Sequence, residues 1–254
     1  MILLLGGTSD AGPIAQRLAA AGYRVLVSQA TEVALLSGEG SGIETRAGTL
    51  DAAALAELVA RRGIRAIVNA THPYAAEIRA TAPRVAGEAG IPYLSFLRPT
   101  VVAPDAPGVE FAADHAAAAA MAFAHGRPVL LTTGAKNLAP YVDAARRTGS
   151  PLLVRVLDRP ESLDACRRAG IPPQRIIAGR GPFTVDENRR QIRHFAAGVL
   201  VTKDSGAPGG TAEKLEAARA EQCKVVVVGR PAPASTQALS SIDELIAAVQ
   251  DVLS

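Results

Sequence analysis

The chain has 254 residues, of which 48% are hydrophobic, 20% are charged and 4% are aromatic. This composition is typical of a folded globular protein, large enough for one large α/β domain or two of ordinary size. The opening run Met1 to Leu5 is too short for a signal peptide or a membrane span, so we expect a cytoplasmic protein with no membrane partner. Tryptophan is absent and no basic run is interleaved with aromatic residues, so nucleic acid is not an expected partner.

The net charge of +3 is unevenly distributed along the chain. Residues 1–126 carry 9 basic and 11 acidic side chains, whereas residues 127–254 carry 18 basic and 13 acidic ones, including all the lysines. A basic half that faces a ligand attracts a molecule with several carboxylates or phosphates. The sequence therefore predicts a polyanionic small molecule as the partner of the second half.

The cysteines and most histidines do not have the spacing of metal ligands. Cys166 and Cys223 are far apart and have no histidine nearby, so we expect no metal site and a reducing compartment. Three histidines fall on predicted helices or at a helix end, without a partner at metal-ligand spacing, and are expected to be structural or solvent-facing: His115, His125 and His194.

Short apolar runs alternate with alanine-rich stretches from one end of the chain to the other. Runs that are apolar throughout are typical of strands covered by helices on both faces, as in a parallel sheet. The predicted strands are Ile2–Leu5, Val25–Val27, Ala66–Val68, Val129–Leu131, Leu152–Leu157, Ile176–Ile177, Val199–Val201 and Val225–Val228. The predicted helices lie near residues 11–21, 51–62, 74–89, 112–124, 137–148, 161–169, 185–196, 211–221 and 242–253. Thr184 with Glu187 and Ser241 with Glu244 have the spacing of capping boxes, which predicts two helix starts.

The proline-rich stretch from Arg98 to Gly108 interrupts this alternation and predicts a crossing between two domains. We therefore expect an α/β fold of two Rossmann-like domains, residues 1–100 and 109–254, with mainly parallel sheets and an interdomain cleft. The sequence does not decide the strand order, and the last predicted strand is compatible with either sheet.

The first strand leads into Gly6, Gly7, Thr8, Ser9 and Asp10. Glycines let the backbone approach an anion, the following helix N-terminus supplies unpaired N–H groups, and the two hydroxyls add donors. Because ligands of open α/β sheets bind at the carboxyl ends of strands, we interpret this loop as a cofactor phosphate site. Its spacing departs from the usual Gly-x-Gly-x-x-Gly pattern, so a tight turn with a helix cap stays open as the alternative.

The second predicted strand ends without the acidic residue that usually holds the ribose of a dinucleotide. Ser28 stands there instead, and Arg46 follows across the next loop. A hydroxyl and a cation suit a 2′-phosphate, so we predict NADPH as the cofactor, bound by both residues. A solvated surface role is the alternative for Arg46.

Thr71, His72, Pro73 and Tyr74 follow the third predicted strand. We expect Thr71 to contact the cofactor and His72 to donate a hydrogen bond or a proton near the strand end. A plain capping role is the alternative for His72. Tyr74 offers either a phenol donor or an apolar pocket wall.

Two further strand-to-helix loops lie in the basic half. Thr133 and Gly134 repeat the strand–glycine–helix design, so they are predicted to contact the cofactor or the second ligand. Lys203 is a cation at a strand end, suited to a carboxylate, a phosphate or a structural ion pair with the adjacent Asp204. The predicted substrate-binding residues are Lys136, Lys203, Asp204, Ser205, Gly206, Lys214 and Arg230.

Seven motifs carry a family resemblance. They are, in chain order, Gly6-Gly7-Thr8-Ser9-Asp10-Ala11, Ala70-Thr71-His72-Pro73-Tyr74-Ala75, Arg98-Pro99, Leu131-Thr132-Thr133-Gly134, Gly181-Pro182-Phe183, Val201-Thr202-Lys203-Asp204-Ser205-Gly206 and Arg230-Pro231. In these motifs, over essentially its whole length, the chain resembles the precorrin-6A reductases. The second and sixth motifs are specific in combination, whereas the first alone is weak.

The resemblance implies an NADPH-dependent oxidoreductase of cobalamin biosynthesis that reduces a double bond of the precorrin-6A macrocycle to give precorrin-6B. It implies a polycarboxylate tetrapyrrole as substrate, with neighbouring cobalamin-pathway enzymes as further partners, and leaves His72, Tyr74 and Lys203 as candidate proton donors. A cobalt-bearing substrate belongs to the anaerobic branch of the family, and the motifs do not separate the branches. Many members have Asp where this chain has Asn69 and Glu where it has Asp10, so position 69 receives no carboxylate function.

Two other functions stay open on the residues alone. A nucleotide-sugar transferase or epimerase would need a Tyr-x-x-x-Lys pair or an acidic base, and Tyr74 is followed by Ile78 where the former needs a lysine. A non-catalytic sensor that binds NADPH and changes shape would bind the cofactor without turning over a tetrapyrrole.

Overall fold

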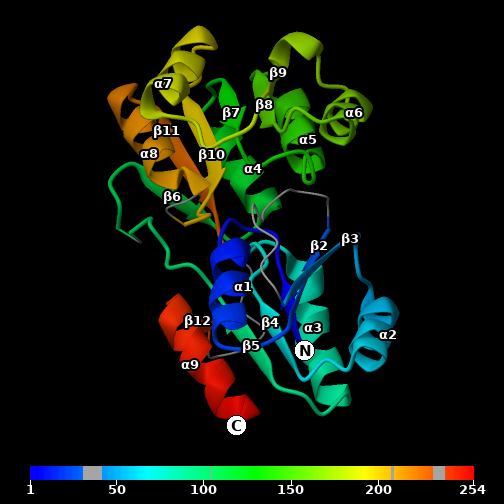
Figure 1. The fold of residues 1–254 in the computed structure, drawn as a ribbon. Helices are drawn as coiled ribbons and strands as arrows, with labels where there is room; N and C mark the ends of the chain where they lie inside the picture. The colour runs from blue at the N-terminus through cyan, green and yellow to red at the C-terminus, as the bar shows by residue number, and fades with distance from the viewer. Residues whose placement is uncertain (31–41, 104, 207–208, 231–237) are drawn as a thin grey trace. The chain divides into compact units, whose positions relative to one another are not determined.

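The computed structural model describes residues 1–30, 42–103, 105–206, 209–230 and 238–254, and Pro231 of the last motif lies outside these ranges (Figure 1). The chain divides into two compact units, Met1–Pro99 with Pro231–Ser254, and Thr100–Arg230. The described part of each unit contains one six-stranded sheet whose strand pairs are all parallel. The predicted α/β fold with two parallel, Rossmann-like sheets is confirmed.

The first unit has the strand order β12-β5-β4-β1-β2-β3. Its strands are β1 Ile2–Leu5, β2 Val25–Gln29, β3 Ile43–Ala47, β4 Ala66–Asn69, β5 Tyr93–Phe96 and β12 Ala238–Leu239. Its helices are α1 Ala11–Ala20, α2 Ala52–Arg62, α3 Ala76–Glu88 and α9 Ile242–Leu253. Ile2 and Leu4 pack with α1 and α9, whereas Leu3 and Leu5 pack with α2 and α3. Both faces of β1 are therefore buried, which explains why its sequence is apolar without alternation.

The second unit has the strand order β6-β11-β10-β7-β8-β9. Its strands are β6 Val109–Ala112, β7 Val129–Leu131, β8 Leu152–Val156, β9 Ile176–Ala178, β10 Val199–Lys203 and β11 Lys224–Val228. Its helices are α4 His115–Ala124, α5 Ala139–Thr148, α6 Pro160–Arg168, α7 Val185–His194 and α8 Thr211–Ala220, with a 3-10 turn at Pro173–Arg175. Leu130, Leu153 and Leu200 pack against α7 and α8. Figure 1 shows these two helices on one side of the sheet and α4 and α5 on the other.

All the predicted helices and strands are present, but four strands were missed, namely β3, β5, β6 and β12. Three of them form sheet edges, namely β3, β6 and β12. The fourth, β5, pairs with β4 on one side, and its other neighbour is the short strand β12, which has two residues. Edge strands are exposed to solvent on one side, so they tolerate polar residues such as those of Ile43–Ala47 and lack the continuous apolar signal of a buried strand.

The C-terminal segment belongs to the first unit, which differs from the predicted second domain of residues 109–254. β12 pairs with β5, and Leu245, Ile246 and Val249 of α9 are buried in the same core as α1. An amphipathic helix requires an apolar partner, but its own pattern does not say which sheet provides it. The strand that was compatible with either sheet, β11, lies in the second sheet between β6 and β10.

One of the two predicted capping boxes forms and the other does not. The Thr184 hydroxyl accepts a hydrogen bond from the Glu187 N–H, and the Glu187 carboxylate accepts one from the Thr184 N–H. Ser241 occupies the cap position of α9, but its side chain makes no capping hydrogen bond. Both predicted helix starts are confirmed, although the reciprocal bonding of a capping box forms only at Thr184.

We expect Thr184→Ala to lower the free energy of unfolding by about 1 kcal/mol, because it leaves a helix N–H without its acceptor. The matched change Ser241→Ala is expected to stay within about 0.5 kcal/mol, because no capping bond is lost there. Urea unfolding of both variants compares the two caps. A larger loss at Ser241 than at Thr184 would contradict this assignment.

Candidate active site

In the first unit, the glycine loop after β1 lies against the loop after β4. A Cβ added at Gly7 would lie 3.9 Å from the backbone nitrogen of His72. The Thr8 hydroxyl donates a hydrogen bond of 3.2 Å to the carbonyl oxygen of Ala70. Since β1 and β4 are neighbouring parallel strands, the two predicted site loops meet at one carboxyl edge of the sheet.

The glycine loop needs its glycines for a geometrical reason. Gly7 has a φ of +149°, which disfavours a side chain, and a Cβ at Gly6 would lie 3.1 Å from the Cβ of Ala11. The backbone therefore turns tightly from β1 into α1, and the first helical residue, Ala11, follows directly. A tight glycine turn that ends at a helix N-terminus can hold a phosphate through backbone N–H groups.

Arg98, at the end of the first unit's chain before the crossing, ties this loop down. Its Nε donates to the Asp10 carboxylate, and its Nη2 donates to the Ser9 hydroxyl at 2.7 Å. The Arg98 and Asp10 side chains are only 9% and 18% exposed. The guanidinium thus neutralises an acidic residue that would otherwise repel an anion in the same loop. The sequence places Arg98 at the start of the crossing and in a family motif but does not predict its contact with Asp10.

Ser28 and Arg46 are brought together at the next strand ends. They are register partners on β2 and β3, and Arg46 Nη1 donates a 2.7 Å hydrogen bond to the Ser28 hydroxyl. Arg46 also donates to the carbonyl oxygens of Gly48 and Ala47. Ser28 is buried and Arg46 is half-buried. The cation is therefore held in place at the end of β2, which is the neighbour of β1 in the sheet.

The loop after β4 is held by two residues that the sequence did not assign to the site. Asn69, fully buried, accepts hydrogen bonds from the Thr71 N–H and hydroxyl and donates to the Tyr93 hydroxyl at 3.0 Å. Arg79 of α3 donates to the carbonyl oxygens of Thr71, His72 and Phe96. Asn69 thus fixes the Thr71 side chain. A carboxylate at this position could also accept the two hydrogen bonds from Thr71, but only the Asn69 amide can donate one to Tyr93 as well.

His72 and Tyr74 lie side by side in this loop. Their ring centroids are 5.5 Å apart, and the His72 Nδ1 accepts a hydrogen bond from the Tyr74 N–H at 3.3 Å. That bond caps the turn before α3, which begins at Ala76, and it directs the ring proton of a neutral His72 to Nε2. The capping role and a donor role are therefore compatible, because they use different ring nitrogens.

In the second unit, Lys203 lies at the carboxyl end of β10 close to His115 and Lys136. Burial and the Lys136 charge lower the pKa of Lys203, and burial followed by the charge of Lys203 lowers the pKa of His115 to about 4. His115 contacts the Tyr141 hydroxyl through Nδ1 at 2.9 Å and the Asn137 amide through Nε2 at 3.1 Å. His115, expected to be structural or solvent-facing, is thus a neutral ring that borders the predicted site.

The loop after β7, which leads to Lys136, follows the strand that pairs with β10. Gly134 has a φ of +85°, and the Thr133 hydroxyl oxygen is buried without a hydrogen-bond partner among the described residues. A buried hydroxyl without a partner is costly, so such an atom is a natural contact for a ligand. Thr133 and Gly134 keep their predicted place at the carboxyl edge, next to the end of β10.

Asp204 is a structural centre of the second unit. Its Oδ2 accepts from the N–H groups of Val101 and Val102, and its Oδ1 accepts from the Gly206 N–H and from Arg230 Nη2 at 3.2 Å. Asp204 forms an ion pair with Arg230. Both oxygens are engaged, so Asp204 positions the loop that contains Ser205 and Gly206, and we expect no substrate contact from its carboxylate.

Lowering the pH from 6.5 to 4 is expected to lower the free energy of unfolding by about 1 to 2 kcal/mol through His115. Its pKa falls from the ordinary value of 6.5 to about 4 on folding, because burial and then the charge of Lys203 disfavour the protonated ring. The unfolded chain therefore binds the proton first, and stability is lost as the pH falls through this window. At about 1.36 kcal/mol per unit the full shift would be larger, but the half-buried ring is screened by solvent.

Urea unfolding at both pH values tests this expectation. His115→Gln should flatten the pH dependence of the unfolding midpoint relative to the parent protein. His194→Gln is the matched control, because His194 is exposed on α7. Equal pH dependence in the parent and in His115→Gln would refute the assignment.

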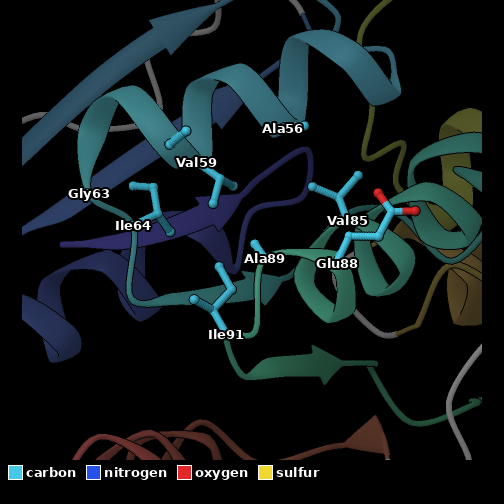
Figure 2. A pocket seen from close by; sticks show the side chains of 9 residues that line it. Ala56, Val59, Gly63, Ile64, Val85, Glu88, Ala89 and Ile91 are labelled. Atoms are coloured by element: carbon cyan, nitrogen blue, oxygen red, sulfur yellow. The ribbon is translucent and has the colours of Figure 1, made fainter.

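A hollow of about 470 Å³ lies elsewhere in the first unit, between α2 and α3 (Figure 2). Figure 2 shows apolar side chains around it, among them Val59, Ile64 and Ile91, with Glu88 as its charged residue. Ile64 and Ile91 precede β4 and β5, so the hollow is at the amino ends of these strands. Ligands of such sheets bind at the opposite edge, so the hollow is not part of the candidate site.

The described residues place limits on two other kinds of site. Within them, no group of three or more His, Cys, Asp and Glu side chains could hold a metal ion. No helix of the described ranges is long and apolar enough to cross a membrane. Cys166 and Cys223 are both buried, and burial raises the pKa of each thiol.

The predicted residues therefore gather at two strand-end edges, one in each unit.

Comparison with known proteins identifies the family. The sequence model of the family described as precorrin-6x reductase CbiJ/CobK matches residues 1–250. The cobalt-precorrin-6A reductase of Priestia megaterium is 31% identical over 250 residues, covering 98% of each chain. The precorrin-6A reductase of Rhodococcus erythropolis is 34% identical over 253 residues, covering 97% of this chain and 96% of its own. A solved structure of CobK precorrin-6A reductase matches with a TM-score of 0.78 at 27% identity, covering 98% of this chain and 96% of the other. The chain belongs to the precorrin-6x reductase family.

Proposed function

We propose that this protein reduces a double bond of the precorrin-6A macrocycle with NADPH, giving precorrin-6B in cobalamin biosynthesis. The observation that carries the cofactor part is the Ser28–Arg46 pair beside the glycine loop. The family membership carries the reaction. In this proposal residues 1–100 bind the cofactor and the second unit contributes the tetrapyrrole site.

The residues of the first unit fit NADPH. Gly6 and Gly7 let the backbone approach a phosphate, and Thr8 and Ser9 add hydroxyls, while Arg98 compensates the charge of Asp10. Ser28 and Arg46 supply a hydroxyl and a cation for a 2′-phosphate. Thr71, on the neighbouring loop, and Thr133 with Gly134 in the second unit are the further proposed cofactor contacts.

The bound nicotinamide would supply a hydride, and a proton from another source completes the addition of two hydrogens to the double bond. The protein's part is to orient the reactants and to match their charges. His72, Tyr74 and Lys203 are the proposed proton donors. His72 suits this role through Nε2, since Nδ1 already accepts the Tyr74 N–H.

The basic second unit suits a substrate with several carboxylates. Burial lowers the pKa of Lys203 and lowers that of Lys214 to about 8, so both lysines are held in partly dry surroundings where attraction to a carboxylate is strong. Lys136, Arg230 and the loop of Ser205 and Gly206 are the other proposed substrate contacts. Asp204 acts through that loop.

Anaerobic incubation with precorrin-6A and NADPH tests the proposal. Coupled loss of the nicotinamide absorbance and change of the tetrapyrrole spectrum is the expected result. Relatives named as cobalt-precorrin-6A and as precorrin-6A reductases match at similar identity, so a cobalt-precorrin-6A arm belongs in the same experiment. Tight NADPH binding without turnover of either substrate would instead favour a sensor.

A further inference from the structure

Arg155 is an arginine within the otherwise apolar strand β8, and its side chain is only 5% exposed. Nη1 donates to the side-chain oxygens of Asn188 at 2.7 Å and Gln191 at 2.8 Å, and the guanidinium stacks 4.3 Å from the centre of the Phe183 ring. These partners are neutral. They fix the orientation of the guanidinium without forming an ion pair. Glu187, which Thr184 holds at the start of α7, acts on the Arg155 charge from beyond ion-pair distance.

Lys214, in the first turns of α8, is the second buried cation of this region, at 9% exposure. Its Nζ donates to the carbonyl oxygen of Gly209 at 3.0 Å. No described carboxylate lies within ion-pair distance of either Lys214 or Arg155. Buried charges that form no ion pair are unfavourable in a protein interior, so this arrangement favours binding of an anion from outside.

A chain of contacts joins the two cations. Arg155 stacks on Phe183, and the neighbouring Pro182 lies where a Cβ at Gly210 would be 3.3 Å away from it. Gly210 is the cap residue of α8, one turn before Lys214. The charge of Arg155 also contributes to the lowered pKa of Lys214. The two cations therefore belong to one cluster.

Hydrogen bonding in this cluster is incomplete. Arg155 Nε and Nη2 have no acceptor among the described residues, and neither is among the fully enclosed atoms without a partner, so both keep access to solvent. Glu213 Oε2 is enclosed and has no partner in the described chain. Arg155 and Lys214 form no ion pair within the described chain, so a carboxylate bound beside them would make direct contacts that Glu187 and Glu213, which act on them from a distance, do not make.

The cluster is separate from Lys203. Alternate residues of a strand point to opposite faces, and Arg155 shares the face of Leu153, which packs against α7 and α8. Lys203 is an odd number of residues from Leu200 on β10 and so points to the other face, where it influences His115 of α4. The carboxyl edge of this sheet thus has one basic cluster on each face.

We propose that Arg155 and Lys214 form a carboxylate-binding subsite on the α7/α8 face, which holds one side-chain carboxylate of a polycarboxylate substrate. The inference rests on the proposed function for the identity of that substrate, and it adds Arg155 as a residue that selects for it. A guanidinium with two adjacent free donors matches a carboxylate geometrically.

Equilibrium binding of a stable porphyrin with acetate and propionate side chains tests the subsite, with its fully esterified form as the uncharged probe. Arg155→Gln and Lys214→Met are each expected to weaken binding of the acid by about 10- to 100-fold, as for loss of a charge-assisted hydrogen bond. Arg155→Lys should recover part of the affinity, and binding of the ester should not change. Arg146→Gln and Lys224→Met, at exposed positions, are the matched controls.

NADPH affinity and circular dichroism report whether each variant is folded, and Lys214→Met decides the question where Arg155→Gln fails to fold. Unchanged affinity for the porphyrin acid in folded variants would overturn the subsite. The same variants assayed with precorrin-6A should show a raised KM. Turnover with an unchanged KM would refute the subsite but keep the proposed function. Weakened porphyrin binding without any turnover in the parent protein would refute the function but keep the subsite.

Discussion

Arg46→Ala is expected to lower the affinity for NADPH by about 10- to 100-fold and to leave the affinity for NADH within about twofold. In the proposed function, Arg46 makes its charge-assisted hydrogen bonds to the 2′-phosphate, which NADH lacks. Arg46 is held by Ser28 and by the carbonyl oxygens of Ala47 and Gly48, so little reorganisation is needed on binding. Cofactor titration followed by fluorescence measures both affinities.

Arg24→Ala is the matched control for Arg46. Arg24 precedes β2 at the amino edge of the same sheet, where its side chain is 70% exposed and paired with Glu44. Its removal should change neither affinity. An Arg46→Ala protein that binds NADPH as tightly as the parent would return Arg46 to the role of a surface arginine and remove the support for NADPH over NADH.

Arg98→Met is expected to lower the free energy of unfolding by about 3 kcal/mol, because it leaves the mostly buried Asp10 carboxylate without its cation. NADPH binding should weaken as well, because the uncompensated carboxylate stands in the glycine loop. Urea unfolding and cofactor titration measure the two effects.

A double-mutant cycle with Asp10→Asn separates the ion pair from other losses. The double variant should lose less stability than the two single variants combined, with a coupling of about 1 kcal/mol or more. Arg61→Met is the control, because Arg61 is paired with Glu57 at 76% exposure and should change stability by less than about 0.5 kcal/mol. Additive losses in the cycle would show that Arg98 acts through other contacts.

The local elements could be predicted because their signals lie within a few residues. Buried parallel strands such as β1 and β10 are apolar throughout, and helices such as α7 show their start in the Thr184–Glu187 pair. Edge strands such as β3 lack this signal because solvent replaces one neighbour. The serine cap of α9 shows that the right spacing is not enough when the side chain does not turn back to the helix.

The candidate site divides in the same way. The glycines and His72 lie just after strands, and Ser28 and Lys203 lie in the last residues of theirs. All of them could be placed at strand ends from the sequence, and the basic charge of the second half is also visible there. Arg155 left a signal that was not used, a charge within an apolar strand. Arg79 and His115 left none, because one basic residue on a helix resembles any other until its neighbours are known.

The sequence by itself determined the alternation of strands and helices, the glycine loop and the family, because these depend on residues adjacent in the chain. The tertiary structure decided which charges meet. Arg98 and Asp10 are 88 positions apart, and Arg155 and Asn188 are 33 apart. It also decided that α9 completes the first unit. Residues so far apart in the chain meet only when whole helices and strands pack together. Parallel strands are compatible with many orders in a sheet, and the strand order determines which distant residues become neighbours.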